Sequence, residues 1–189
     1  LQDPVRRRSQ HGRHGSRERP LSEPALTCPA GGERCLTPGE IALVRSVFGD
    51  AIDTAKVRIR RRCWFPFQPR RITMAPMGHL HFHPASSSYC DDFSLAGIGL
   101  QGHFIHEMTH VWQAQQRGWW YLPLCRPFSR RYDYSLKPGW PLTRYGIEQQ
   151  AEIIRHAFLL RQGYRLAGVG DEAAYDLLVD FSGTNTGPA

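Results

Sequence analysis

Residues 104–113 read FIHEMTHVWQ, and this stretch decides both the fold and the chemistry that we expect of the chain. Its apolar residues recur at the spacing of one helical face, and Gly118 follows as a terminator, so we predict a helix over residues 102–117. Within it, His106 and His110 are four residues apart and project from the same face. Two imidazoles so placed can bind one tetrahedral zinc ion.

Glu107 completes an HExxH motif. It lies one position off the line of the histidines, where its carboxylate can contact a water molecule on the metal rather than the metal itself. Zinc lowers the pKa of that water towards neutrality, and Glu107 can take its proton and pass it to the leaving amine. The motif therefore predicts a zinc-dependent peptidase with Glu107 as the catalytic base. Residues 111–113 read VWQ and do not continue the longer HExxHxxGxxH pattern, which argues against the metzincin class.

A catalytic zinc site needs a third protein ligand and one open position. Residues 148–152 read EQQAE and place two carboxylates, Glu148 and Glu152, four residues apart on a helix that we expect over residues 146–162. This arrangement resembles the zincins with a glutamate ligand, where the first Glu binds the metal and the later acid orients a ligand histidine. The resemblance implies that Glu148 is the third ligand and Glu152 the orienting acid. The alternative, Glu152 on the metal, stays open.

Three further side chains are candidates for stabilising the oxyanion that forms when water attacks a carbonyl group: Tyr132, Tyr134 and His156. Each could instead be a packed aromatic ring or a surface group. Residues 79–83 read HLHFH and would place alternate histidines on one face of a strand. A second metal site there is the less favoured interpretation, because an edge strand that pairs with an extended peptide substrate is commoner.

The rest of the chain indicates a small α+β domain, and the resemblance to the zincins with a glutamate ligand implies that this domain is zincin-like. Residues 37–40 read TPGE, in which Thr37 can cap a helix, proline suits its first turn and Glu40 completes a capping box. Alternation of apolar and charged residues predicts a strand over residues 55–60. We also expect two short extended segments, at residues 71–75 and 78–83, and a last short helix at residues 171–179. A few short strands with two or three helices are typical of the α+β class.

Composition sets the broad class of protein. The 189 residues are enough for one domain with a core, and 41% hydrophobic with 22% charged residues is ordinary for a globular protein. No apolar run is long enough to span a membrane. The formal net charge of +7 comes almost wholly from arginine and favours acidic partners, although it could also reflect solubility alone. No nucleic-acid-binding motif accompanies the arginines, so specific nucleic-acid binding is not expected.

Three regions are expected along the chain. Residues 1–27 carry scattered arginines among Gly, Ser and Pro, and read as a basic tail or linker without a signal-peptide pattern. Residues 28–182 form the predicted metallopeptidase domain, and residues 183–189 a polar C-terminal tail. Five cysteines leave at least one unpaired within the chain, and Cys28 and Cys35 are close enough in sequence to close a small loop.

Residues 104–113, the YDY at 132–134 and the IEQQAE at 147–152 together resemble a bacterial family. They are similar to the zinc metallopeptidase domains at the C-termini of VgrG spike proteins in type VI secretion, over about residues 36–165. The resemblance implies an effector that the spike carries into a neighbouring bacterium. There it would act in the periplasm on a protein or peptidoglycan peptide, and an immunity protein could protect the producer.

A different class of function is also compatible with the sequence. The domain could be a non-catalytic, basic binding module in which zinc is purely structural and closed by four ligands. The two interpretations differ in what Glu107 does: replacing it would abolish hydrolysis in the first and change nothing in the second.

Overall fold

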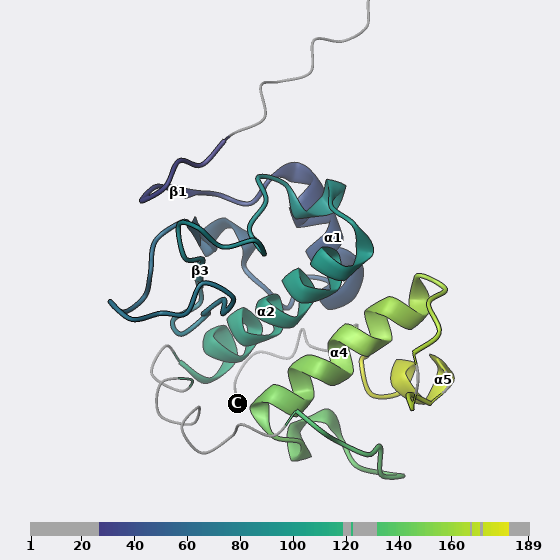
Figure 1. Ribbon diagram of the computed structural model, residues 1–189. Helices are drawn as coiled ribbons and strands as arrows, with labels where there is room; N and C mark the ends of the chain where they lie inside the picture. Colours follow the sequence, from purple (N-terminus) through teal and green to yellow (C-terminus); the bar gives the residue numbers. More distant parts are fainter. Residues whose placement is uncertain (1–26, 119–121, 123–131, 167, 171, 182–189) are drawn as a thin grey trace, which may run out of the picture.

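The computed structural model describes residues 27–118, 122, 132–166, 168–170 and 172–181. Within these ranges the chain forms an α+β domain in which a small sheet and one helix lie on one side of a pair of longer helices (Figure 1). The predicted tails, residues 1–27 and 183–189, lie outside the described residues except for residue 27. The elements are β1 (Glu33–Arg34), α1 (Pro38–Phe48), η1 (Thr54–Lys56), β2 (Ile59–Arg60), β3 (Leu80–His81), η2 (Phe93–Leu95), α2 (Ile98–Arg117), η4 (Leu142–Arg144), α4 (Ile147–Arg161) and α5 (Glu172–Asp176).

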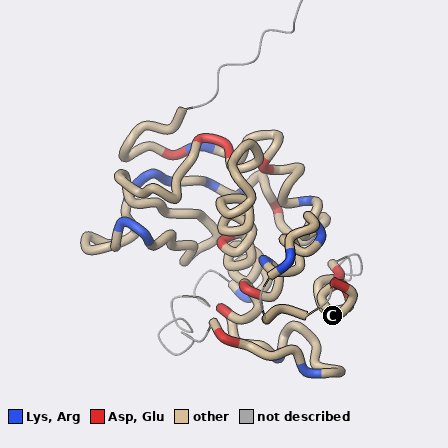
Figure 2. The backbone as a smooth tube through the Cα atoms, turned by 45° about the vertical axis from the view of Figure 1, so that its right-hand side comes forward, with Lys and Arg blue, Asp and Glu red and all other residues tan. Residues whose placement is uncertain are grey.

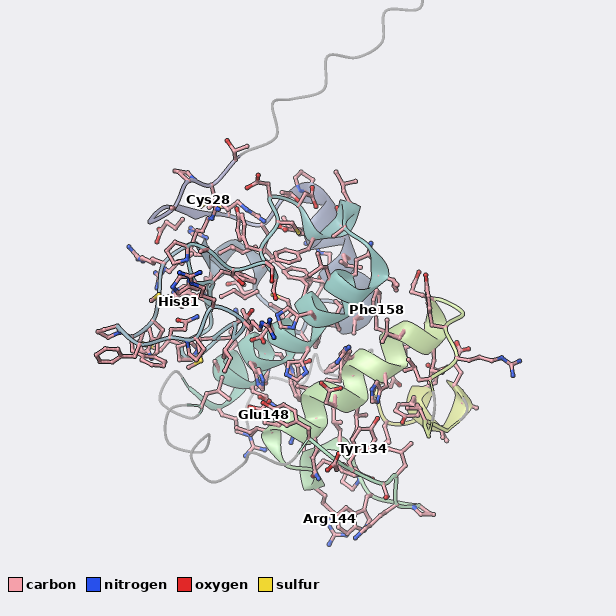
Figure 3. The ribbon with its side chains drawn as sticks, viewed as in Figure 1. Cys28, His81, Tyr134, Arg144, Glu148 and Phe158 are labelled. Atoms are coloured by element: carbon pink, nitrogen blue, oxygen red, sulfur yellow. The ribbon has the colours of Figure 1, made fainter. Side chains whose placement is uncertain are left out.

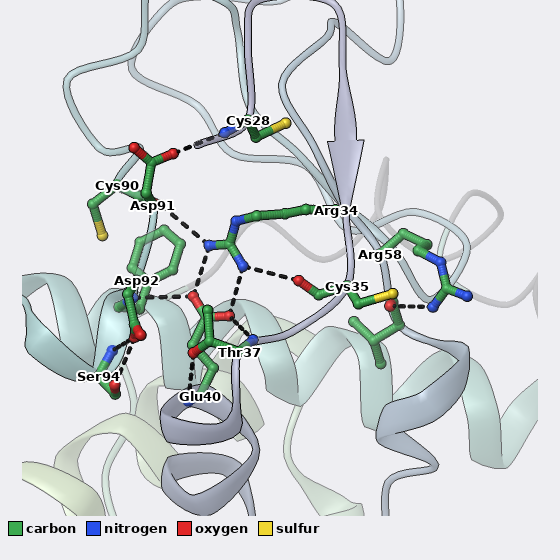
Figure 4. Close-up of polar contacts among 12 residues, drawn as sticks. Cys28, Arg34, Cys35, Thr37, Glu40, Arg58, Cys90, Asp91, Asp92 and Ser94 are labelled. Carbon is green, nitrogen blue, oxygen red and sulfur yellow. Dashed lines mark hydrogen bonds and ion pairs between the residues drawn. The ribbon is translucent and has the colours of Figure 1, made fainter. Parts of the chain in front are cut away.

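Helix α1 begins with the predicted capping box. The hydroxyl of Thr37 accepts a hydrogen bond from the backbone N–H of Glu40, and the Glu40 carboxylate accepts one from the backbone N–H of Thr37. The same carboxylate forms a buried, two-pronged ion pair with Arg34, with N–O distances of 2.7 and 2.8 Å (Figure 4). It also accepts from the backbone N–H of Phe93 at 3.0 Å. Glu40 therefore ties β1, α1 and η2 together.

The sheet is smaller than the sequence pattern suggested. Each strand has two residues; β2 pairs antiparallel with β1 and parallel with β3. Of the strand predicted over residues 55–60, only Ile59–Arg60 is present. Residues 54–56 form a 3₁₀ turn instead, in which Lys56 pairs with Asp53. The two expected extended segments meet at an antiparallel bridge between Met74 and His81.

Helices α2 and α4 pack antiparallel and carry most of the chemistry. Both were predicted, but α2 begins at Ile98, four residues earlier than expected. Their facing residues are buried, with Phe104 and Met108 from α2 packed in one core with Ile154 and Phe158 from α4. The helices come close at Gly102, where an added Cβ atom would lie 3.3 Å from the side chain of Leu159. None of the described helices is both long and apolar enough to cross a bilayer.

The loop before α2 is held by two acidic side chains. Asp91 accepts hydrogen bonds from the backbone N–H of Cys28 at 3.1 Å and from the hydroxyl of Tyr89 at 2.7 Å. Asp92 accepts from the backbone N–H of Ser94 at 2.9 Å and so begins η2. Cys28 and Cys35, which are close in sequence, are both free thiols.

Candidate metal centre

Three side chains from the two antiparallel helices converge. His106 and His110 of α2 lie opposite Glu148 of α4, and one potential ligand atom from each lies within 4.8 Å of the other two. The Nε2 atoms of His106 and His110 are 3.5 and 3.2 Å from Oε2 of Glu148. All three side chains are buried. Figure 3 shows Glu148 on the part of α4 that lies against α2.

The spacing of these atoms fits a small divalent cation. Zinc bonds of about 2.0–2.1 Å in a tetrahedron put neighbouring ligand atoms roughly 3.3 Å apart, close to the two distances seen here. Nε2 of His110 is buried and makes no hydrogen bond within the described part of the chain. A buried polar nitrogen without such a partner costs free energy unless something else binds it. A metal ion bound by the three side chains would satisfy it.

The other nitrogen of each histidine is held by a neighbouring side chain. Nδ1 of His110 lies 2.9 Å from Oε1 of Gln113, and Nδ1 of His106 lies 3.0 Å from Oε1 of Glu152. Gln113 is itself fixed, because its amide donates to Oε1 of Gln150 at 2.9 Å and to a backbone carbonyl of α4 at 3.0 Å. The acceptor at Nδ1 of His110 keeps the proton there and leaves Nε2 free to bind a metal, whereas Glu152 contacts His106 as an ion pair.

Charges around His106 shift the pKa values of the metal-free site. Burial lowers the pKa of His106, but its contacts with Glu148 and Glu152 outweigh burial and raise that pKa to about 9. Burial raises the pKa of Glu152. The contact with His106 and the charge of the nearby Arg155 together outweigh burial and lower that pKa to about 2. His106 is therefore an imidazolium that faces two carboxylates, and a metal ion bound at its ring would have to displace a proton.

Glu107 lies beside the three ligands, in a pocket of about 210 Å³. Its side chain is almost fully buried, and its Oε2 atom has no hydrogen bond within the described residues. Its other oxygen is 4.0 Å from Nε2 of His103, and that nitrogen lies 2.8 Å from the hydroxyl of Thr73. Burial lowers the pKa of His103, which favours its neutral form. Glu107 thus has one oxygen available to a water molecule or substrate.

The three oxyanion candidates lie in two different places. The ring of Tyr132 stacks 6.4 Å from that of His106 and lines the Glu107 pocket. The hydroxyl of Tyr134 instead bonds Nδ1 of His156 in a neighbouring pocket of about 700 Å³. Nε2 of His156 is 3.4 Å from Oε2 of Glu152. In the described structure Tyr134 and His156 therefore contact the centre through Glu152, whereas Tyr132 lies at its edge.

The histidines of residues 79–83 do not join the centre. His81 lies on β3, away from Glu148 (Figure 3), and its ring contacts the ring of Trp64 at 5.3 Å. Burial and the nearby Arg60 lower the pKa of His81 to about 4. Within the described residues these histidines are not part of any group that could hold a metal ion.

Sequence reasoning missed two side chains that contact the motif. His103 is four residues before Glu107, and Gln113 is three residues after His110, so both lie on the face of α2 that carries the motif. That helical spacing was a signal available in the sequence. The contacts of His103 with Thr73 and of Gln113 with α4 depend on tertiary packing, which the spacing does not give.

Comparison with known proteins identifies relatives of the chain. No protein-family model matches it. It is 40% identical, over 148 residues, to the type VI secretion system spike protein VgrG2b of Pseudomonas aeruginosa, matching 75% of this chain but only 14% of that protein. Its fold is similar to the solved effector domain of Pseudomonas aeruginosa VgrG2b, with a TM-score of 0.63 and 36% identity over 84% of this chain and 88% of that one. The chain belongs to the family of VgrG2b effector domains.

Proposed function

We propose that this chain is a zinc-dependent metallopeptidase, and that it is the effector domain of a type VI secretion spike. The observation that carries the proposal is the convergence of His106, His110 and Glu148 within 4.8 Å, with Glu107 in the pocket beside them. Two nitrogens and one carboxylate oxygen are the donor set of a catalytic zinc site. The solved relative is named an effector domain, which supports the secretion context.

Each residue of the centre has a part in this chemistry. Zinc held by the two Nε2 atoms and Oε2 of Glu148 would supply the positive charge that acidifies water and polarises a carbonyl group. The Glu107 carboxylate takes a proton from the attacking water at Oε2 and later gives it to the leaving amine. Glu152 and Gln113 hold the imidazoles in position through Nδ1. We assign the donor to the developing oxyanion to Tyr132, whose ring lies 6.4 Å from that of His106.

The number of ligands favours catalysis over a structural role for the metal. Structural zinc sites are closed by four protein ligands, whereas catalytic sites keep one position open. The candidate group has three members in the part of the chain that the structure describes. A fourth position would then be open to water and substrate, next to Glu107.

The biological setting is proposed from the relatives. The chain spans 14% of the length of the curated spike protein, so it corresponds to one part of such a protein. We propose that the arginine-rich residues 1–27 link residues 28–182 to a spike. The domain would be carried into a neighbouring bacterium and hydrolyse a protein or peptidoglycan peptide in its periplasm, where an immunity protein would protect kin.

Metal analysis and a single substitution test the proposal. We expect about one zinc ion per purified chain, and a Glu107→Gln variant that keeps the zinc but loses at least about a hundredfold in peptide hydrolysis. Glu172→Gln, on the short helix α5, is the matched control and should behave like the parent. Expression directed to the periplasm should be toxic for the parent and the control only. Zinc-free parent protein, or hydrolysis by Glu107→Gln at the parent rate, would refute the proposal.

A further inference from the structure

The pocket beside Glu107 carries two arginines that the mechanism does not use. Arg71 reaches it from the loop between β2 and β3, and Arg155 from α4. They share its lining with Thr73 and His103 and with two carboxylates, Glu107 and Glu152. Guanidinium groups at a reaction centre are recognition elements for carboxylates, because their donors form a planar fork that matches the two oxygens.

Arg71 is available to an external anion. Its side chain is exposed, and it makes no ion pair or side-chain hydrogen bond within the described part of the chain. Residues 54–90 contain seven basic residues and no acidic one, so its own segment offers no partner (Figure 2). Arg60 and Arg62 in the same segment are paired with Glu33. In the part of the chain that the structure describes, Arg71 has no such neutralising contact.

Arg155 is only partly neutralised by its neighbour. Its Nη1 atom is 3.3 Å from each oxygen of Glu152, a longer contact than the 3.0 Å between Glu152 and His106. Its Nε atom is buried and makes no hydrogen bond within the described residues. Because a guanidinium has five N–H donors, the terminal nitrogens of Arg155 retain donors for another acceptor, whereas Nε is buried next to Gly102 of α2. A divalent cation at the neighbouring centre would add positive charge to the same surroundings.

The size of the pocket sets how much of a ligand it can take. At about 210 Å³ it is smaller than the roughly 300–1,000 Å³ of sites that enclose a whole small molecule. It suits one side chain or one chain terminus of a longer substrate, with the scissile bond lying over Glu107. Thr73 and His103 add polar groups to its wall.

We propose that this pocket binds a substrate carboxylate through Arg71 and Arg155, so that the enzyme selects peptides with a carboxylate next to the scissile bond. The inference rests on the proposed peptidase function and names its substrate class. The carboxylate can belong to an acidic side chain or to a free chain terminus, and both sources offer the same two oxygens to the guanidinium groups.

Binding of small probes tests the pocket without any need for turnover. The zinc-loaded full chain is titrated with two probes. N-acetylglutamate α-amide carries a side-chain carboxylate, and N-acetylglycine carries a terminal one. The controls are the same two molecules with that carboxylate replaced by an uncharged amide. Binding is followed by nuclear magnetic resonance at Ile72 and Thr73, which line the pocket. We expect at least one carboxylate probe to bind about tenfold or more tightly than its amide. The probe that does so identifies the source.

Substitutions separate the pocket from the metal as the carboxylate's binding site. Arg71→Gln should remove the preference for carboxylate, and Arg155→Gln should weaken it. The control Arg70→Gln, an exposed neighbour that does not line the pocket, should keep it. Equal binding of carboxylate and amide by the parent overturns the proposal, as does a preference that survives both pocket substitutions.

Digestion of a random peptide library gives the second readout. The parent should cleave beside acidic residues or near a free carboxyl terminus, and Arg71→Glu should shift the preference towards Lys or Arg. Cleavage without any such preference overturns the proposal. The parent could cleave no peptide and still bind the carboxylate probe more tightly than its amide, with this preference lost in Arg71→Gln. The proposed peptidase function would then be refuted, and the pocket would remain a carboxylate-binding site.

Discussion

At the scale of single residues, the centre depends on groups that set where protons reside. In the metal-free protein, burial opposes the charge on His106 but Glu148 and Glu152 raise its pKa to about 9. Zinc binds only the deprotonated ring, so binding near neutral pH must release a proton. We therefore expect zinc affinity to rise about tenfold per pH unit between about pH 7 and pH 9. Competition with a coloured chelator at several pH values measures it.

Replacing the acid beside His106 gives the matching control. Glu152→Gln removes a carboxylate that raises the pKa of His106, so this pKa should be lower in the variant. The pH range over which zinc affinity increases should therefore shift to lower pH. Calorimetry in two buffers with different ionisation enthalpies should then detect fewer protons released at pH 8. A pH profile identical to that of the parent would contradict the role of Glu152 at Nδ1.

Gln113 is the corresponding partner of His110. Gln113→Leu removes the acceptor at Nδ1, so the ring can take the wrong tautomer and orientation. Loss of such a partner lowers metal affinity by about 10–100-fold, which chelator competition measures directly. Gln116→Leu, on the exposed side of the same helix, should bind zinc like the parent. Equal affinities for the two variants would show that Gln113 has no orienting role.

At the scale of elements, the N-terminal part of the domain depends on one buried ion pair. Glu40 caps α1, pairs with Arg34 and accepts from the backbone of Phe93. Glu40→Ala leaves the Arg34 charge buried and unpaired, and we expect it to cost about 3–5 kcal/mol in the free energy of unfolding. Urea denaturation measures this value.

An exposed pair serves as the comparison. Glu33 is half exposed and pairs with Arg60 at 3.1 Å, so Glu33→Ala should cost less than about 1 kcal/mol. A cost for Glu40→Ala as small as that for Glu33→Ala would show that the Arg34 pair contributes little to folding.

The sequence predicted the long elements better than the short ones. Residues 104–113 and 147–159 repeat apolar positions over several turns, which fixes a helix largely without help from the rest of the chain. The start of α2 was missed because Gly97 occupies its N-cap and is a weaker signal than Ser, Thr, Asp or Asn. Two-residue strands carry too little pattern to predict, since pairing with a distant segment decides them.

The residues of the candidate site also differ in how far the sequence could predict their positions. Spacing alone placed His106 and His110 on one helix face, with Glu107 one position off their line. Whether Glu148 or Glu152 lies nearer the Nε2 atoms depends on how α4 is rotated against α2, which no local pattern contains. The same holds for Arg71, which a loop distant in sequence brings to the pocket.

At the scale of the whole molecule, the metal should contribute to stability. Its ligands come from α2 and α4, so the site exists only when both helices are packed. Free zinc at a hundred times Kd adds about 2.7 kcal/mol, and chelation should lower Tm by roughly 5–10 °C. Differential scanning calorimetry measures the shift. Glu148→Gln should lose most of this response to zinc; an unchanged parent Tm after chelation would argue against a bound ion.

The antiparallel pairing of the two helices has a consequence for how the gene can vary in length. Contacts between them follow one continuous register: Gly102 with Leu159, His106 with Glu152, and His110 with Glu148. A one-residue deletion inside either helix would rotate everything beyond it by about 100° and separate these partners together. Added residues between Gly118 and Gly146 leave the register untouched. Natural insertions and deletions should therefore accumulate in that interval and be rare within the helices.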